Sequence, residues 1–279
     1  MLAVEPARVG VIGGSGLYEF LDDVEFVEPS TPYGKPSGPI ALAQVHGPGG
    51  GHRVAFLPRH GPKHHLPPHG VNYRANLWAF RELGVERVLG PFACGSLQVD
   101  IRPGDLVVCD QFVDRTSGRR DTFFDGPVVN HVSIADPYCP ELRTLTIDIA
   151  RRREMVVHDA GTVVIVQGPR FSTRAESTWF RRMGWQVVGM TQYPEVALAR
   201  ELGMCYAGLG IITDYDTGVE GVPDVRPVTQ EEVFAFFAAN VSKVRDLLEA
   251  IVGALPSTRS CDCASAANGI DPTPPPDAS

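Results

Sequence analysis

The sequence predicts an α/β protein, in which one domain has a mixed, mostly parallel and twisted central sheet flanked by helices. Strand-like apolar segments alternate with helix-like segments along nearly the whole chain, and parallel strands need such helical crossovers. Of the 279 residues, 43% are hydrophobic and 21% are charged, which is typical of a globular protein. No repeat, linker or change of composition interrupts residues 5–255. We therefore predict a single domain over residues 1–255.

The N-terminal half begins with a predicted buried strand and a glycine-rich turn. Residues 8–12 are mostly apolar and β-branched, and Gly13-Gly-Ser-Gly16 follows at once. A helix is predicted over residues 72–83, because large apolar residues recur there at helical spacing and Gly84 follows as a stop signal. Further strands are predicted at residues 53–57, 87–90, 93–96 and 106–109.

The C-terminal half continues this alternation. Thr229 and Glu232 have the spacing of a capping box, which predicts the start of a long helix that ends near residue 255. The other segments are assigned from β-branched runs and from helical spacing. The remaining predicted helices are 140–153, 174–183 and 194–202, and the remaining predicted strands are 162–166, 187–189 and 205–213.

The last segment, residues 256–279, has a different composition. Serine, alanine, proline, aspartate and glycine dominate it, and three prolines follow one another at positions 274–276. Such a segment buries too little apolar area to offset the conformational entropy that ordering costs. We therefore predict a disordered C-terminal tail over residues 256–279.

Charge and hydropathy exclude several classes of protein. The formal net charge is −8, which argues against a nucleic-acid binder that relies on positive charge. No apolar run reaches the roughly 18–20 residues that span a bilayer, and the N-terminus has no hydrophobic signal core. We expect a cytoplasmic protein without a membrane or nucleic-acid partner.

Neither the cysteines nor the histidines predict a metal site. The six cysteines include no Cys-x-x-Cys pair. The pattern Cys261-Asp-Cys263 is interpreted as incidental, with a redox clip as the alternative. Five histidines lie between His52 and His69, but prolines break any helix that would align them for zinc. We expect one or two of these histidines to face a ligand, and no bound metal.

Polar residues follow several predicted strands, and ligands of open α/β sheets bind beyond the carboxyl ends of strands. The loop Gly13–Gly16 lacks the spacing of a dinucleotide or P-loop motif. A plain tight turn is therefore as good an interpretation of this loop as an anion-binding role. Arg59 and His60 follow the second strand, and this pair of donors suits a phosphate-sized dianion. A surface ion pair with a turn is the alternative. Ser15 and Thr191 can add hydroxyl donors from other strand ends.

Two carboxylates close the most apolar strand. Asp214 and Asp216 follow residues 206–212, where a turn-capping role is one interpretation. The other is acid chemistry, because a carboxyl group beside an apolar strand has a raised pKa and can protonate a leaving-group nitrogen. Phe171, also at a strand end, can stack on an aromatic ring or pack in the core.

Together these motifs resemble the trimeric purine nucleoside phosphorylase superfamily, and most closely its 5′-methylthioadenosine phosphorylase branch. The resemblance covers about residues 8–252, and the motifs occur in the family's order. They are Gly-Gly-Ser-Gly-Leu (13–17), Thr-Pro-Tyr-Gly-Lys-Pro-Ser (31–37), Arg-His-Gly (59–61), Asn-Tyr-Arg-Ala-Asn (72–76), Ala-Cys-Gly-Ser-Leu (93–97), Gln-Gly-Pro-Arg-Phe-Ser (167–172), Gly-Met-Thr (189–191) and Thr-Asp-Tyr-Asp (213–216).

The resemblance implies a binding site for a nucleoside and for phosphate, which is a co-substrate, and it implies no cofactor. The implied phosphate contacts are Ser15, Arg59, His60, the backbone of Phe92 and Ala93, and Thr191. The implied nucleoside contacts are Phe171, Ser172, Met190, Asp214, Tyr215 and Asp216. It also implies a homotrimer, or a dimer of trimers, in which His131 reaches a neighbouring subunit's site.

The implied reaction is phosphorolysis of S-methyl-5′-thioadenosine to adenine and 5-methylthioribose 1-phosphate. A neutral Asp214 would donate to purine N7, while Asp216 would accept from the 6-amino group. Ser172 and Asp214 stand where 6-oxopurine phosphorylases carry glutamate and asparagine. Phe92 departs from the family, which often has a hydroxyl residue there, and this removes a side-chain donor to phosphate.

Three alternatives to this reaction remain at the level of the sequence. The first is a 6-oxopurine nucleoside or methylthioinosine phosphorylase. The second is a nucleosidase that uses water in place of phosphate. The third is a non-catalytic metal- or nucleotide-binding module, for which the clustered histidines are the only support.

Overall fold

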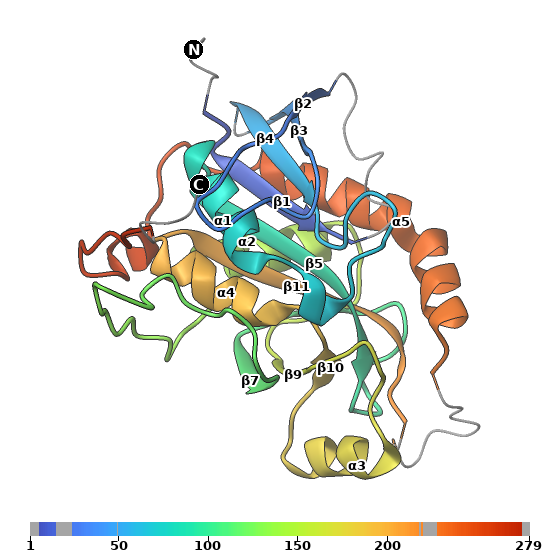
Figure 1. Cartoon of the computed structure of the whole chain (residues 1–279). Helices are drawn as coiled ribbons and strands as arrows, with labels where there is room; N and C mark the ends of the chain where they lie inside the picture. The colour runs from blue at the N-terminus through green and yellow to red at the C-terminus, as the bar shows by residue number, and fades with distance from the viewer. Residues whose placement is uncertain (1–5, 15–23, 49, 218, 220–227, 275–279) are drawn as a thin grey trace.

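An eleven-stranded mixed sheet forms the centre of the computed structural model (Figure 1). The structure describes residues 6–14, 24–48, 50–217, 219 and 228–274. The strands are β1 (Val9–Gly13), β2 (Glu25–Val27), β3 (Ile40–Gly47), β4 (Gly50–Pro58), β5 (Arg87–Ser96), β6 (Leu106–Val108), β7 (Gln111–Arg115), β8 (Val157–His158), β9 (Thr162–Val166), β10 (Val187–Gly189) and β11 (Cys205–Tyr215). The helices are α1 (Tyr73–Glu82), α2 (Pro140–Arg152), α3 (Arg174–Arg182), α4 (Gln192–Glu201) and α5 (Gln230–Gly253), with short 3-10 turns at Pro68–Gly70 and Asp262–Ser265.

The predicted fold class is confirmed by the topology of this sheet. Six of its ten strand pairings are parallel and four are antiparallel. The main path runs β2-β3-β4-β1-β5-β10-β9-β7, and β11, β6 and β8 branch from β5. The long strands β5 and β11 pair in parallel along their whole length, so they form the centre of the molecule.

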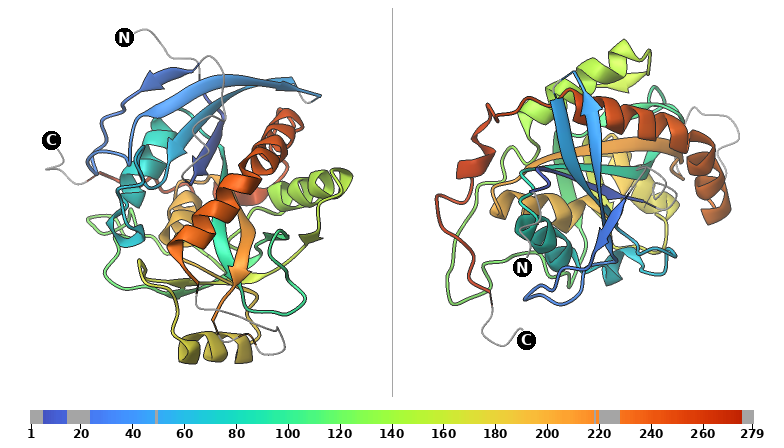
Figure 2. Two further views of the ribbon diagram at one scale, coloured as in Figure 1. Left: turned by 90° about the vertical axis from the view of Figure 1, so that its right-hand side faces the viewer. Right: turned by 90° about the horizontal axis from the view of Figure 1, so that it is seen from above.

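Helices cover both faces of the sheet, as the alternation of side chains along each strand requires. In β1, Ile12 belongs to the core that α1 and α4 share, whereas Val9 and Val11 belong to the core shared with α2 and α5. The two further views show α5 along one side of the sheet, and the left one shows α3 by itself at the foot of the molecule (Figure 2). None of the helices in the described part of the chain is both long and apolar enough to cross a membrane.

The sequence-based strand assignments differ from the structure in two ways. Residues 87–90 and 93–96 are one continuous strand, β5, because β11 pairs with it on both sides of Pro91. The sequence also failed to predict β2, β3, β7 and β8. β3 contains alanine, glutamine and glycine, which have low intrinsic β-propensity, and antiparallel pairing with β4 holds it in the sheet.

The C-terminal segment differs from the predicted disordered tail, because residues 256–274 pack on the body of the protein. Arg259 donates to the Gly203 carbonyl at 2.9 Å. The backbone N–H and the hydroxyl of Ser260 both donate to Glu141, at 2.5 and 2.6 Å. The side chain of Cys263 is only 3% exposed. Polar and sulfur contacts replace the apolar burial that the composition lacks.

Candidate active site

The site lies where β5 changes partners. Along one edge, β5 pairs with β1 as far as Leu89 and with β10 from Gly95 onward, while β11 occupies the other edge. The intervening residues 90–94 therefore have no strand partner on the first edge. A cavity of about 660 Å³ opens there. Its lining includes Phe92 and Ala93 of this segment, so backbone polar groups of a central strand border a ligand-sized space.

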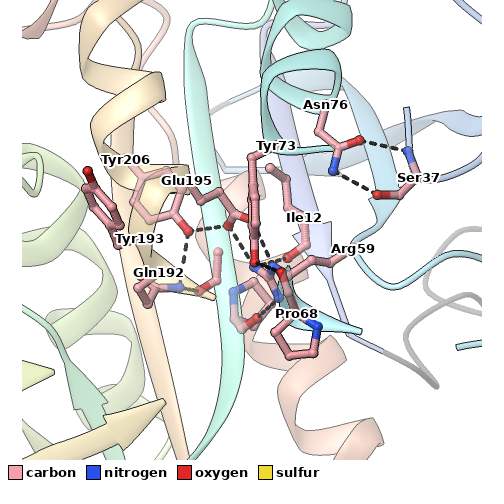
Figure 3. A network of polar contacts seen from close by, with 12 residues as sticks. Ile12, Ser37, Arg59, Pro68, Tyr73, Asn76, Gln192, Tyr193, Glu195 and Tyr206 are labelled. Carbon is pink, nitrogen blue, oxygen red and sulfur yellow. Dashed lines mark hydrogen bonds and ion pairs between the residues drawn. The ribbon is translucent and has the colours of Figure 1, made fainter. Parts of the chain in front are cut away.

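A buried ion pair holds this gap open (Figure 3). The Arg59 guanidinium binds both oxygens of the Glu195 carboxylate, with Nε and Nη2 each at 2.8 Å, and the exposed fractions of the two side chains are 1% and 0%. Arg59 also donates to the carbonyls of Pro91 at 3.0 Å and Ile12 at 2.9 Å. These four bonds use four of the five guanidinium N–H groups. Arg59 thus ties β4 to β1, β5 and α4, and one N–H remains for a ligand.

Two further side chains complete the network. Tyr206 donates to Glu195 Oε1 at 2.5 Å, and Gln192 Nε2 donates to the Gly90 carbonyl at 3.3 Å. Burial alone would lower the pKa of Arg59, but the Glu195 carboxylate outweighs it and raises that pKa further. The Arg59 guanidinium therefore stays charged at any physiological pH.

His60 is neutral in this environment. Burial, and then the adjacent Arg59 charge, lower the pKa of His60 to about 4. Its Nδ1 lies 2.9 Å from the Leu66 carbonyl, which only accepts hydrogen bonds, so Nδ1 carries the proton. Nε2 of the neutral ring is then an acceptor. Phosphate therefore binds beside this ring only if a proton lies between Nε2 and a phosphate oxygen. Either the ring takes up that proton or the anion supplies it.

The other residues assigned to phosphate lie around the same cavity. Thr191 and Ala93 line it, as does Gly14 beyond the end of β1, whereas Ser15 falls outside the described residues. Phe92 also lines the cavity and is 4% exposed. Its ring fits beside two glycines: a methyl group at Gly189 would lie 3.0 Å from the ring, and one at Gly210 would lie 3.3 Å from it.

Asp214 and Asp216 enter the cavity from the end of β11. The register of β11 against β5 shifts between Ile212 and Asp214, and such a bulge redirects the side chains that follow it. Thr213 Oγ1 donates to Asp214 Oδ2 at 2.6 Å. Burial raises the pKa of both carboxyl groups, that of Asp216 to about 6.

Asp216 is surrounded by polar atoms without partners. Asp216 Oδ2 and the hydroxyls of Ser172 and Ser177 are buried, and none of the three has a hydrogen-bond partner within the described residues. The two hydroxyls are close enough to Asp216 to oppose the rise of its pKa. Buried polar groups are almost always paired in native proteins, so either small rotations that pair the two hydroxyls with Asp216 or a polar ligand would satisfy this cluster.

Not every residue assigned from the sequence lines the cavity. Phe171, Ser172 and Met190 do. Tyr215 does not, and its hydroxyl instead donates to the Val99 carbonyl at 3.3 Å. His131 is exposed and is not part of the cavity lining of the single chain.

Several residues of the site carried no sequence signal. Glu195 lies in the first turn of α4 and is paired only through the fold. Arg119 donates to the carbonyls of Met190 and Gln167, at 2.9 and 3.0 Å, and so connects two loops beside the cavity. Phe234 of α5 is 40% exposed at the cavity and contacts the His64 ring edge-on, with centroids 5.0 Å apart. A sequence pattern cannot reveal such contacts, because each joins residues far apart in the chain.

Comparison with known proteins identifies close relatives. Residues 8–253 match the family model described as the phosphorylase superfamily. A purine nucleoside phosphorylase of Streptomyces coelicolor is 54% identical over 95% of this chain and 96% of its own length. An S-methyl-5′-thioadenosine phosphorylase of Thermofilum pendens is 49% identical over 94% and 98%. The methylthioadenosine phosphorylase of Schistosoma mansoni, solved with adenine, superposes with a TM-score of 0.81 at 39% identity over 88% of this chain and 91% of that chain.

Replacing Glu195 by glutamine should destabilise the whole fold. Glu195→Gln leaves the Arg59 charge buried without compensation, so we expect the free energy of unfolding in urea to fall by ~3 kcal/mol or more. Asp159→Asn is the matched control, because it removes the carboxylate of the exposed Arg151–Asp159 pair and should cost less than ~1 kcal/mol. Equal losses for the two variants would contradict the central role of the buried pair.

Proposed function

The chain belongs to the phosphorylase superfamily, and we propose that it cleaves S-methyl-5′-thioadenosine with inorganic phosphate. The products are adenine and 5-methylthioribose 1-phosphate. Relatives from several organisms that are 47–52% identical to this chain are named for this activity. The observation that carries the proposal is the pair of carboxyl groups, half-buried Asp214 and buried Asp216, in a cavity that also holds the Arg59 and His60 motif.

The carboxyl pair supports purine recognition. A purine leaves poorly as an anion, so N7 needs a hydrogen-bond donor as the C1′–N9 bond breaks. Two interacting carboxyl groups with raised pKa values can hold one proton between them. With that proton on Asp214 toward N7, an ionised Asp216 accepts from the 6-amino group. The unpaired hydroxyl of Ser172 offers a further polar contact.

The phosphate end provides the nucleophile. The last free N–H of Arg59, the backbone N–H groups around Phe92 and Ala93, and Thr191 can bind phosphate oxygens. His60 is neutral without an anion, so phosphate binding raises its pKa and takes up a proton. One phosphate oxygen forms the bond to C1′ as the bond to N9 breaks, and the bound dianion stabilises the positive charge on the sugar.

Apolar residues of α5 support a methylthio substituent over a hydroxyl group. Val233, Phe234 and Val241 line the cavity together with Ala238. An apolar wall gives a methylthio group van der Waals contact and leaves a 5′-hydroxyl without a partner. One such difference in contact changes the ratio of kcat/KM between the two substrates by about 10–200-fold.

The quaternary structure is part of the proposal. His131 is exposed on a loop, and we propose that it completes the site of a neighbouring subunit in a homotrimer. The cytoplasm is the proposed location, as expected from the sequence.

A second candidate is a 6-oxopurine nucleoside phosphorylase. The pKa of Asp216 is raised to about 6, so its protonated form is accessible and can donate to a 6-oxo group. The relative from Streptomyces coelicolor is named purine nucleoside phosphorylase. The choice between the two therefore depends on the protonation state of one carboxyl group.

A substrate panel tests the proposed function. Methylthioadenosine, adenosine, inosine and methylthioinosine are each incubated with the enzyme, with and without phosphate, and free base is measured. We expect methylthioadenosine to have the highest kcat/KM, by ~10-fold or more over adenosine, and expect no base release without phosphate. Faster cleavage of inosine favours the second candidate, and phosphate-independent release of adenine identifies a nucleosidase.

Replacing Asp216 by asparagine should change both selectivity and pH dependence. Asp216 accepts from the 6-amino group only when ionised, so kcat/KM for methylthioadenosine should rise as the pH approaches about 6 from below. Asp216→Asn removes this rise and lowers kcat/KM by ~10-fold or more, while its amide N–H favours a 6-oxo group. Asp159→Asn, far from the cavity, should keep the wild-type profile. An unchanged pH profile in Asp216→Asn would refute the assigned role.

Adding a methyl group at Gly95 should impair the carboxyl pair. The new Cβ would lie 2.9 Å from Asp214 Oδ1 and 3.2 Å from Asp216 Cβ, which is too close for either to keep its position. We expect Gly95→Ala to lower kcat/KM by ~100-fold, with a smaller effect on thermal stability. Gly51→Ala is the control, since its nearest neighbour is the His46 ring at 3.1 Å on the exposed start of β4. Wild-type activity in Gly95→Ala would contradict the geometry of the site.

A further inference from the structure

Four cysteines meet at one point outside the active site. The sulfur atoms of Cys139, Cys205, Cys261 and Cys263 all lie within 4.8 Å of one another. Three of these side chains are buried, Cys261 is half-buried, and none belongs to the cavity lining. They come from the residue before α2, the first residue of β11, and the C-terminal segment, so the fold brings together residues distant in the chain.

We propose that these four cysteines bind one zinc ion as a structural site that fastens the C-terminal segment to the body of the protein. Zinc in structural sites takes four thiolates in a tetrahedron at about 2.3 Å, which places the sulfurs about 3.8 Å apart. The Cys205 and Cys261 sulfurs are 3.3 Å apart, and the widest separation in the group is under 4.8 Å. Small side-chain shifts therefore convert the cluster into a tetrahedral ligand set.

The surroundings of the cluster suit thiolates. Cys139 is the N-cap of α2, where the helix dipole favours a negative charge. Arg200 Nη1 lies 3.9 Å from Cys263 Sγ. Arg259 donates to the Gly203 carbonyl at 2.9 Å, two residues before Cys205 in the chain. A zinc ion with four thiolates carries a net charge of −2, and these two cations and the helix end offset it.

Backbone contacts fix the ligands before any metal binds. The Cys139 N–H donates to the Tyr206 carbonyl at 2.8 Å, and the Cys205 N–H donates to the Glu86 carbonyl at 2.9 Å. Binding of zinc displaces the thiol protons to solvent.

The four-cysteine site lies near the C-terminal end of the part of the chain that matches the family model. The match to the family ends at residue 253, whereas Cys261 and Cys263 follow it. The segment that they anchor also contacts the loop that contains His131, because Asn130 Nδ2 donates to the Ala267 carbonyl at 3.0 Å. The zinc site therefore supports a loop that the proposed function assigns to a neighbouring active site, although the metal test below is independent of that function.

The sequence-based expectation of no metal site is replaced by this proposal. A lone Cys-x-Cys pattern supplies only two ligands, and positions 139 and 205 give no local signal. Two disulfides are the competing chemistry for the same four sulfurs, and they would need an oxidant.

Zinc content and intact mass test the proposal directly. The purified full-length protein, reduced and incubated with zinc chloride, is desalted and measured by elemental analysis and native mass spectrometry. We expect one zinc ion per chain, an all-thiol mass after denaturation, and a thiolate-to-metal absorption band on replacement by Co²⁺. Absence of bound zinc, with disulfides or free thiols in its place, would overturn the site.

Single-residue variants distinguish the proposed zinc ligands from other cysteines. Cys261→Ser and Cys263→Ser should lose the zinc, whereas Cys109→Ala, which removes a buried cysteine outside the cluster, should keep it. Cys261→His should also keep it, because imidazole binds zinc but cannot form a disulfide. Full zinc occupancy in Cys263→Ser would contradict the ligand set, even if the enzyme remains active.

Discussion

The buried ion pair between Arg59 and Glu195 is the constraint on which the site depends. A guanidinium without water is tolerated only when nearly all of its N–H groups are bonded, and here a carboxylate and two backbone carbonyls meet that need. Those carbonyls belong to β1 and β5 near the point where the two strands diverge. One interaction therefore sets both the width of the gap in the sheet and the position of the cavity within it.

The same gap explains how a negatively charged protein can bind an anion. With a net charge of −8, long-range attraction is not available, so local donors must hold phosphate. The gap supplies backbone N–H groups, and in the proposed reaction the carboxyl pair at the end of β11 supplies the proton for the base. The sheet thus positions anion-binding donors and a pair of carboxyl groups around one cavity.

Local patterns predicted most of the fold, and they predicted the parts of the site that follow strand ends. Apolar runs followed by Arg59-His60 or by Asp214 to Asp216 locate groups at the carboxyl edge of the sheet, as the structure has them. The sequence did not predict that most of the Arg59 N–H groups bond to protein atoms. Two of those bonds are to Glu195, which lies far from Arg59 in the chain. It also missed the packed C-terminal segment, because composition does not reveal the sulfurs that residues 139 and 205 contribute.

The central claim is that a phosphate oxygen, and not water, attacks the sugar. It is tested most directly with ¹⁸O-labelled phosphate and methylthioadenosine in ordinary water, with mass spectrometry of the sugar product. The account predicts a sugar 1-phosphate in which the oxygen on C1′ carries the label. An unlabelled free sugar, with its C1′ oxygen taken from water, would contradict it.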